Sequence, residues 1–140
     1  MRFALLFILA LICTGCPQRL VSRQVTLAGL TGDAQTSASV SVTSPEVQTA
    51  LMIIDRVLAS YGFAPTADPN LTVPDTLVTY AKLTPEGLTM GGPSVSLKDG
   101  RLVVVVAGRG GLSAESKSIL KAVRAELKNH YGADRVKTGR

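Results

Sequence analysis

The chain has 140 residues, a formal net charge of +5, two cysteines, one histidine and no tryptophan. At this length it forms one domain, and its 46% of hydrophobic residues suffice for an ordinary packed core without disulfides. One histidine and so few cysteines exclude a zinc site of ordinary spacing, so we expect no metal and no cofactor.

The chain begins with the features of an export signal. Arg2 precedes an unbroken apolar run over residues 3–12, which is typical of a signal-peptide core and is too short to span a bilayer. The next residues, Cys13-Thr14-Gly15-Cys16, resemble the lipobox of bacterial lipoproteins, although Cys13 stands where that family usually has an aliphatic residue. The resemblance implies removal of residues 1–15 and lipidation of Cys16 by a diacylglycerol and a further acyl chain such as palmitate.

The same resemblance implies a location for the protein. It would be a lipoprotein of the bacterial cell envelope, held in the membrane through Cys16, with its domain facing the periplasm. Pro17 follows this cysteine, whereas Asp at that place is the family's usual signal for retention in the inner membrane, so the outer membrane is favoured. The alternative is an ordinary secretory signal cleaved near Gly15, which leaves Cys16 as a free thiol.

The segment after the cysteine predicts a linker and then a strand. Residues 16–37 are rich in small and polar side chains and are interpreted mainly as a lipid-anchored tether. A weak alternation at Val25 and Leu27 leaves a short strand as the alternative there. In residues 38–42 apolar side chains alternate with serine, which predicts a half-buried strand. The folded domain is therefore expected over residues 38–132, followed by a basic tail over residues 133–140.

A Ser-Pro-Glu sequence at residues 44–46 predicts the start of a helix, because serine caps, proline fits the first helical position and an acid favours the positive end of the helix dipole. Gly62 predicts its end. Its expected buried stripe comprises Val47, Ala50, Leu51, Ile54, Val57, Leu58 and Tyr61. Met52 and Ile53 lie outside this arc, so they form either a partner-docking flank or apolar positions partly covered by a neighbouring loop.

The middle of the chain predicts strands joined by turns. The expected elements are a loop over residues 65–74, a strand over residues 77–83 and a short strand over residues 88–90. Gly91-Gly92-Pro93 is expected to end that short strand. Residues 95–98 and 101–107 flank Asp99-Gly100, whose preference for positive φ predicts a type I′ hairpin turn. The second hairpin strand is apolar on both faces, which predicts a central place in the sheet.

Ser113 predicts the N-cap of a second helix, which Tyr131-Gly132 is expected to end in the manner of the first. Its expected buried stripe comprises Ser116, Ile119, Leu120, Val123 and Leu127. Another face of this helix carries a basic stripe, which consists of Lys117, Lys121, Arg124 and Lys128. We expect the stripe either to bind an anionic partner, such as lipid headgroups, lipopolysaccharide or an acidic protein, or to keep the domain soluble. No nucleic-acid partner is expected, because no aromatic interleaving or helix-turn-helix spacing accompanies the basic residues.

The order of these elements predicts an α+β fold, a two-layer sandwich in which two helices pack on one face of a small antiparallel or mixed sheet. The passage over residues 51–80, with Tyr61-Gly62-Phe63 at its helix end, resembles a family of small bacterial outer-membrane lipoproteins of unknown function. The strand at residues 99–103 and the closing helix occur in the same order there. The lipoproteins that assist lipopolysaccharide assembly are similar in pattern, and that likeness implies an assembly accessory without catalysis. Neither family supplies a functional residue for this chain.

The search for chemistry yields one candidate site. His130, in the last turn of the second helix, is interpreted as a dipole partner or surface residue rather than a base. The segment Gly108-Arg109-Gly110-Gly111 joins a strand to a helix N-terminus, where backbone amides can hold an anion. Its expected anion-binding residues are Arg109, Gly110, Gly111 and Ser113. The alternative is a plain connection, because the segment lacks the Lys-Ser/Thr ending of a P-loop.

The sequence therefore favours a lipid-anchored periplasmic binding or envelope-assembly module without catalysis. Its expected partners are the membrane, through Cys16, and an envelope protein, anionic lipid or lipopolysaccharide on its surface. Met52, Ile53 and the basic stripe are the candidate partner surfaces. The alternative function is a small anion-binding protein or enzyme that uses the loop at residues 108–111.

Overall fold

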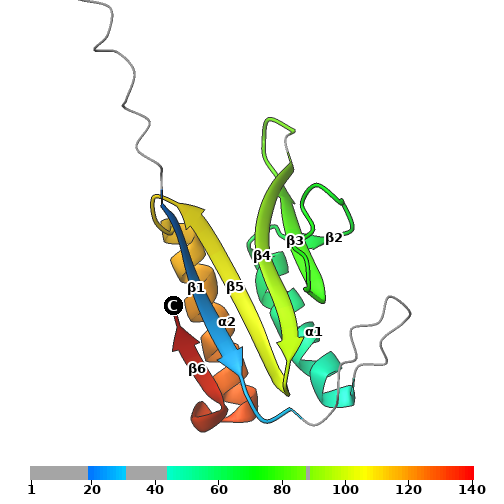
Figure 1. The fold of residues 1–140 in the computed structure, drawn as a ribbon, viewed down its shortest axis with the longest axis vertical. Coiled ribbons are helices and arrows are strands. Elements are labelled where there is room, and N and C mark those ends of the chain that lie inside the picture. Colours follow the sequence, from blue (N-terminus) through cyan, green and yellow to red (C-terminus); the bar gives the residue numbers. More distant parts are fainter. Residues whose placement is uncertain (1–18, 31–43, 88) are drawn as a thin grey trace, which may run out of the picture.

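A six-stranded antiparallel sheet forms one layer of the molecule, and both helices cover the same face of it (Figure 1). The structure is a computed structural model that describes residues 19–30, 44–87 and 89–140. The elements are β1 (Leu20–Leu27), α1 (Pro45–Ser60), β2 (Ala64–Thr66), β3 (Val78–Leu83), β4 (Thr89–Lys98), β5 (Arg101–Arg109), α2 (Ala114–Tyr131), a 3₁₀ turn η1 (Ala133–Arg135) and β6 (Val136–Gly139). The strand order is β2-β3-β4-β5-β1-β6. The expected α+β sandwich is confirmed.

The hairpin at the centre of the sheet forms as expected. Lys98 pairs with Arg101 across a turn in which Asp99 has φ 50° and Gly100 has φ 67°, the left-handed values that a type I′ turn requires. β5 continues from this turn and lies between β4 and β1. Its alternate residues therefore contact the helix layer, and the expected central place of this strand is confirmed.

Local capping signals set three of the four helix ends. The Ser44 hydroxyl accepts the Val47 N–H at 3.4 Å, and the Ser113 hydroxyl accepts the Ser116 N–H at 3.0 Å. α1 ends in a Schellman motif, in which the Phe63 N–H donates to the Leu58 carbonyl at 3.0 Å. α2 ends differently, because Gly132 has φ 90° but an extended ψ of 155°. That geometry turns the chain into η1 and back toward the sheet.

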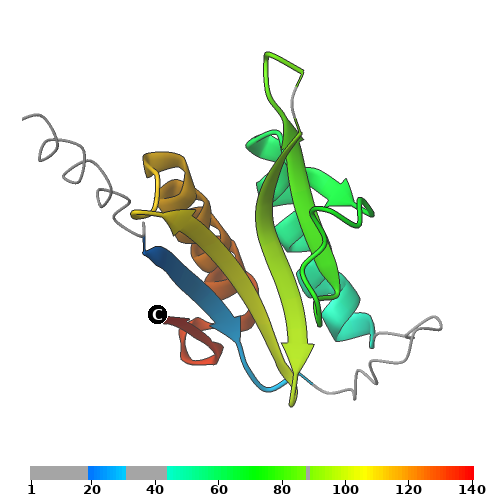
Figure 2. The ribbon, with the colours of Figure 1, turned by 45° about the horizontal axis from the view of Figure 1, so that its top comes forward.

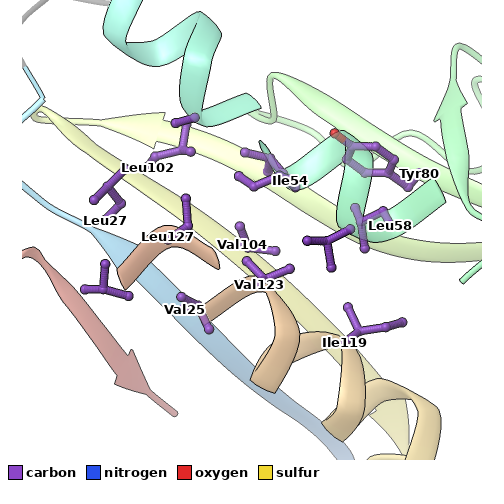
Figure 3. Close-up of a cluster of buried hydrophobic side chains, with 14 of the residues drawn as sticks. Val25, Leu27, Ile54, Leu58, Tyr80, Leu102, Val104, Ile119, Val123 and Leu127 are labelled. Atoms are coloured by element: carbon purple, nitrogen blue, oxygen red, sulfur yellow. The ribbon is translucent and has the colours of Figure 1, made fainter. Parts of the chain in front are cut away.

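The hydrophobic core lies between the sheet and the two helices (Figure 3). α1 contributes Ile54 and Leu58 to it, and α2 contributes a stripe over three turns. The α2 residues that are buried are Ile119, Val123 and Leu127, and the strand residues beneath them include Val25, Leu27, Leu102 and Val104. Leu120 and Ser116, expected in the buried stripe of α2, are only half-buried at its margin.

The N-terminal part of the described chain departs from the expected tether. Residues 20–27 form β1, which pairs along its whole length with β5 and over Gln24 to Leu27 with β6. β6 in turn occupies residues 136–139, where a basic tail was expected. The tether and the tail were wrong for these residues, whereas the alternative of a short strand at Val25 and Leu27 is confirmed. Both segments are strands by pairing with partners that are far away in the sequence.

β4 also departs from expectation, since it runs without a break through Gly91, Gly92 and Pro93. The pairing of β3 with β4 shifts register between Thr79 and Ala81, so the irregular residues are absorbed as a bulge. A side-chain carbon on Gly92 would lie 2.4 Å from the Phe63 ring, so glycine is needed for this ring to pack.

Pro65, placed in a loop from the sequence, belongs to β2. The strand expected at residues 38–42 and the proposed lipidation residue Cys16 lie outside the described residues.

Candidate functional site

An open groove of about 560 Å³ lies between α2 and the edge of the sheet where β1 meets β6. Four parts of the chain line it: β1, the residue before the α2 cap, the first half of α2, and the end of β6. The lining residues are Arg23, Gln24, Leu112, Lys117, Leu120, Thr138, Gly139 and Arg140. Three of these side chains are cations and none is an acid, so the groove attracts negative charge.

The positions of Arg23 and Lys117 follow from the periodicity of their elements. Arg23 shares the helix-facing side of β1 with the buried residues Val25 and Leu27, but it lies beyond the last β1 residue paired with β6 and is exposed. Lys117 lies on the flank of α2 opposite to Glu115, which pairs with Lys82 of β3 at 2.6 Å. The acid of the first turn is therefore kept out of the groove.

The basic stripe extends the charge of the groove along α2. Lys117 lines the groove itself, while Lys121 and Arg124 are exposed and Lys128 is half-buried on the same flank. The ion pairs within the described part of the chain are Lys82–Glu115 and Arg135–Glu46, so no stripe residue is neutralised by an acid there. The four residues share one flank of α2, as their helical spacing predicts.

The loop at residues 108–111 is largely occupied by contacts within the chain. The Gly110 N–H donates to the Arg19 carbonyl at 3.0 Å, and the Ser113 hydroxyl lies 2.9 Å from the Ser116 hydroxyl while it caps α2. Arg109 is exposed at the end of β5, opposite Leu20 of β1. Two of the groups expected to bind an anion are therefore already engaged.

The apolar pair proposed on α1 is separated by the packing. Met52 is 60% exposed, whereas Ile53 is half-buried and packs against the core. His130 packs edge-on against Tyr131, with ring centroids 4.7 Å apart. Neither feature converges with a second functional side chain, so the groove is the better candidate site.

Sequence reasoning missed a polar link beneath α1. Tyr80 of β3 is 0% exposed, and its hydroxyl donates to a carboxylate oxygen of Asp55 in α1. Burial, followed by the hydrogen bond and charge of Asp55, raises the pKa of Tyr80 above its ordinary value. The link fixes β3 against α1. The signal was weak, because Asp55 lies at the edge of an apolar stripe that alone would suggest an exposed position.

Arg135 forms a second link that was not foreseen. Its guanidinium donates to the carbonyl oxygens of Ala28 at 3.0 Å and Gly29 at 2.7 Å, and to the carboxylate of Glu46 at 2.7 Å. It also lies over the Tyr131 ring, 5.2 Å from its centroid. One side chain thereby joins the end of β1, the start of α1 and the turn before β6, and so fixes one side of the grooved edge.

Comparisons of the chain with protein-family models, with curated proteins and with solved structures found no match. Within residues 19–30, 44–87 and 89–140, no three side chains of the histidine, cysteine, aspartate or glutamate types gather as metal ligands. In the same ranges neither helix has the length and hydropathy to cross a membrane.

Proposed function

We propose that this chain is a lipid-anchored module of the bacterial envelope that binds a partner through the groove between α2 and the β1–β6 edge. The observation that carries the proposal is the convergence of Arg23, Lys117 and Arg140 on one groove whose lining has no acidic side chain. Such a site holds a ligand by shape and charge. The proposal assigns no catalytic step, and it places the module in the periplasm, preferably on the outer membrane.

The short segment between Cys16 and β1 supports a position of the domain close to the bilayer. Only Pro17 and Gln18 separate Cys16 from Arg19, the first described residue, and three peptide units reach roughly 11 Å at most. A lipid on Cys16 therefore holds the β1 end of the domain close to the headgroups. α2 begins at this same end of the molecule (Figure 1), so the groove opens beside the membrane.

The direction of α2 favours a protein partner over the bilayer for most of the basic stripe. From Lys117 to Lys128 the helix rises roughly 16 Å, and it leads away from the end that carries β1's first residue, as the turned view also shows (Figure 2). Lys117 is near the headgroups in this arrangement. Arg124 and Lys128 are left for a partner that stands beside the domain.

The anchor is tested by the substitution Cys16→Ala in cells. We expect it to abolish acylation and to leave either uncleaved precursor or a soluble form, because one acylated cysteine provides the whole membrane attachment. Cell fractionation and labelling with a fatty-acid analogue measure both effects, and Cys13→Ala, with the acceptor cysteine intact, is the matched control. A Cys16→Ala protein that remains processed and membrane-bound would show that the anchor lies elsewhere.

A further inference from the structure

We propose that the groove takes an extended acidic peptide segment of a partner protein, added to β1 as a further strand in line with β6. The inference rests on the proposed binding function, since it names the class of partner for the same groove. It does not depend on the lipid anchor, because the contacts involved are all within the described domain.

The free edge of β1 is defined by its hydrogen-bonding pattern. The Ala28 N–H donates to the Arg135 carbonyl at 2.9 Å, and the register continues through Thr26 with Lys137 and Gln24 with Gly139. In an antiparallel pair every second residue bonds to the same neighbour, so even-numbered residues of β1 point their backbone groups toward β6. Odd-numbered residues bond to β5, as the Gly110 N–H to Arg19 carbonyl bond shows.

This pattern leaves part of the edge without a strand neighbour. β6 ends at Gly139 opposite Gln24, so the backbone N–H and C=O groups of Ser22 and Leu20 point past its end. No strand among the described residues pairs with them on that side. An extended segment can therefore continue the line of β6 and take up these groups as a short added strand.

The side chains around this edge specify the chemistry of the segment. Arg23 and Lys117 line the groove on the helix side of such a strand, together with Leu112 and Leu120, which pack against the core. Leu20 is 66% exposed on the opposite face of β1. Because side chains of a strand alternate between faces, the complementary segment has carboxylates on its helix-facing side and apolar residues on the other side, beside Leu20.

The same charges argue against a second copy of this chain as the occupant. Two β1 edges joined about a twofold axis would bring both copies of Arg23 and Lys117 together without an intervening acid, and like charges in contact oppose association. Edge strands flanked by cations are a known protection against self-pairing. The carboxylates of an acidic partner are instead attracted by Arg23 and Lys117.

The first experiment measures peptide binding to the full chain purified in detergent. The probe is a short fluorescent peptide of alternating glutamate and valine, followed by fluorescence anisotropy at low and high salt. We expect saturable binding that salt weakens. A peptide with lysine in place of glutamate should not bind. A peptide N-methylated at its valines, whose N–H groups would face β1, should bind at least roughly tenfold more weakly. Equal binding of the N-methylated and parent peptides would rule out strand addition.

The second experiment changes the groove and a matched surface. The double variant Arg23→Glu with Lys117→Glu should lose roughly tenfold or more in affinity, whereas Lys98→Glu with Arg101→Glu, at the far end of the β4–β5 hairpin, should change it by less than about twofold. Ser22→Pro removes an edge N–H without touching the β1–β5 bonds, so it should weaken binding while the melting temperature stays close to that of the parent. Equal losses of affinity in the two charge variants would mean that net charge alone governs binding, and would contradict a specific role of the groove.

Two further outcomes would overturn the proposal. A dimer by light scattering that the Ser22→Pro change dissociates would assign the edge to a second copy. Binding to vesicles of anionic lipid that is lost in the Arg23→Glu, Lys117→Glu variant, with no binding of the acidic peptide, would assign the groove to headgroups. Since every measurement is made in solution, a failed Cys16→Ala test leaves these results unaffected.

Discussion

The two edges of the sheet are built in opposite ways. At one edge β2 has only three residues, of which Pro65 lacks an N–H, and the preceding Phe63 is buried against the β3–β4 layer. The following loop folds back on the sheet, where the Val73 N–H donates to the Thr79 hydroxyl at 3.2 Å. At the other edge β6 pairs with only half of β1 and stops beside a basic groove.

The difference shows that this small domain protects its edges by two separate means. A short strand with a proline and a covering loop closes the β2 edge by removing donors and access. The β1 edge has backbone groups without a strand neighbour, and cations flank it. These charges repel another copy of the same edge but not an acidic strand. An edge that is protected by charge can still pair with a strand of opposite charge. For this reason we place the binding function there.

The largest expected effect distinguishes the two ends of β1. Leu27 is 0% exposed beneath α2, whereas Leu20 is 66% exposed at the open end of the same strand. Leu27→Ala should therefore lower the free energy of unfolding by about 2–5 kcal/mol, and Leu20→Ala should change it by less than about 0.5 kcal/mol. Urea denaturation measures both. Similar small losses at the two positions would mean that β1 is not an integral strand.

The next effect concerns the closed edge. A Cβ on Gly92 would lie 2.4 Å from the Phe63 ring and 3.1 Å from the Tyr80 carbonyl oxygen, whereas one on Gly91 would meet only Leu71 at 3.6 Å. Gly92→Ala should cost about 1–3 kcal/mol of stability through overpacking. Gly91→Ala is the matched control and should be nearly neutral in the same thermal melts. A neutral Gly92→Ala would mean that the ring moves aside without cost.

The smallest expected effect is a dependence of stability on pH that arises from Tyr80, near the β2 edge. Its pKa is raised above the ordinary 10.0 chiefly by burial, so the folded state favours the protonated phenol. This stability is complete below about pH 10 and is lost as the pH rises further, because tyrosine of the unfolded chain then ionises first. Tyr80→Phe should cost about 1 kcal/mol at neutral pH, through the lost hydrogen bond to Asp55, and should flatten the alkaline decline.

Equilibrium unfolding between about pH 8 and pH 11 measures this decline. Some decline should remain in the variant, because burial and then Glu46 also raise the pKa of Tyr131. Tyr131→Phe therefore serves as the comparison, and it should flatten the curve less than Tyr80→Phe does. Identical curves for the parent and Tyr80→Phe proteins would show that ionisation of Tyr80 does not cause the loss of stability at alkaline pH.

The features predicted correctly from the sequence are those that neighbouring residues determine. The caps at Ser44 and Ser113 and the turn at Asp99-Gly100 act over a few residues, so their spacing was enough to place both helices and the central hairpin. β1 was predicted only weakly, because Arg23 interrupts the apolar face formed by Val25 and Leu27, and the rest of the segment resembles a linker. Its strand conformation depends on β5, some eighty residues later in the chain.

The candidate site was predictable only in part for the same reason. The basic stripe of α2 follows from helical spacing, and the structure preserves it. The groove, however, combines Lys117 with Arg23 and Arg140, and only the pairing of β1 with β5 and β6 brings them together. The loop at residues 108–111 carried the more recognisable motif, but the Arg19 carbonyl occupies one of its amides, a contact that residue types alone do not disclose.

The pairing of Gln24 with Gly139 also has a consequence for how the chain acquires its shape. β1 is synthesised before both of its neighbours in the sheet, so it has no strand partner until β5, some eighty residues later, has been made. Pairings between such distant segments form slowly compared with local hairpins. The helix and the strands from residue 45 to residue 109 can associate first, and β1 and β6 then close the sheet around α2. With this order of assembly the sheet stays incomplete until β1 and β6 have joined it.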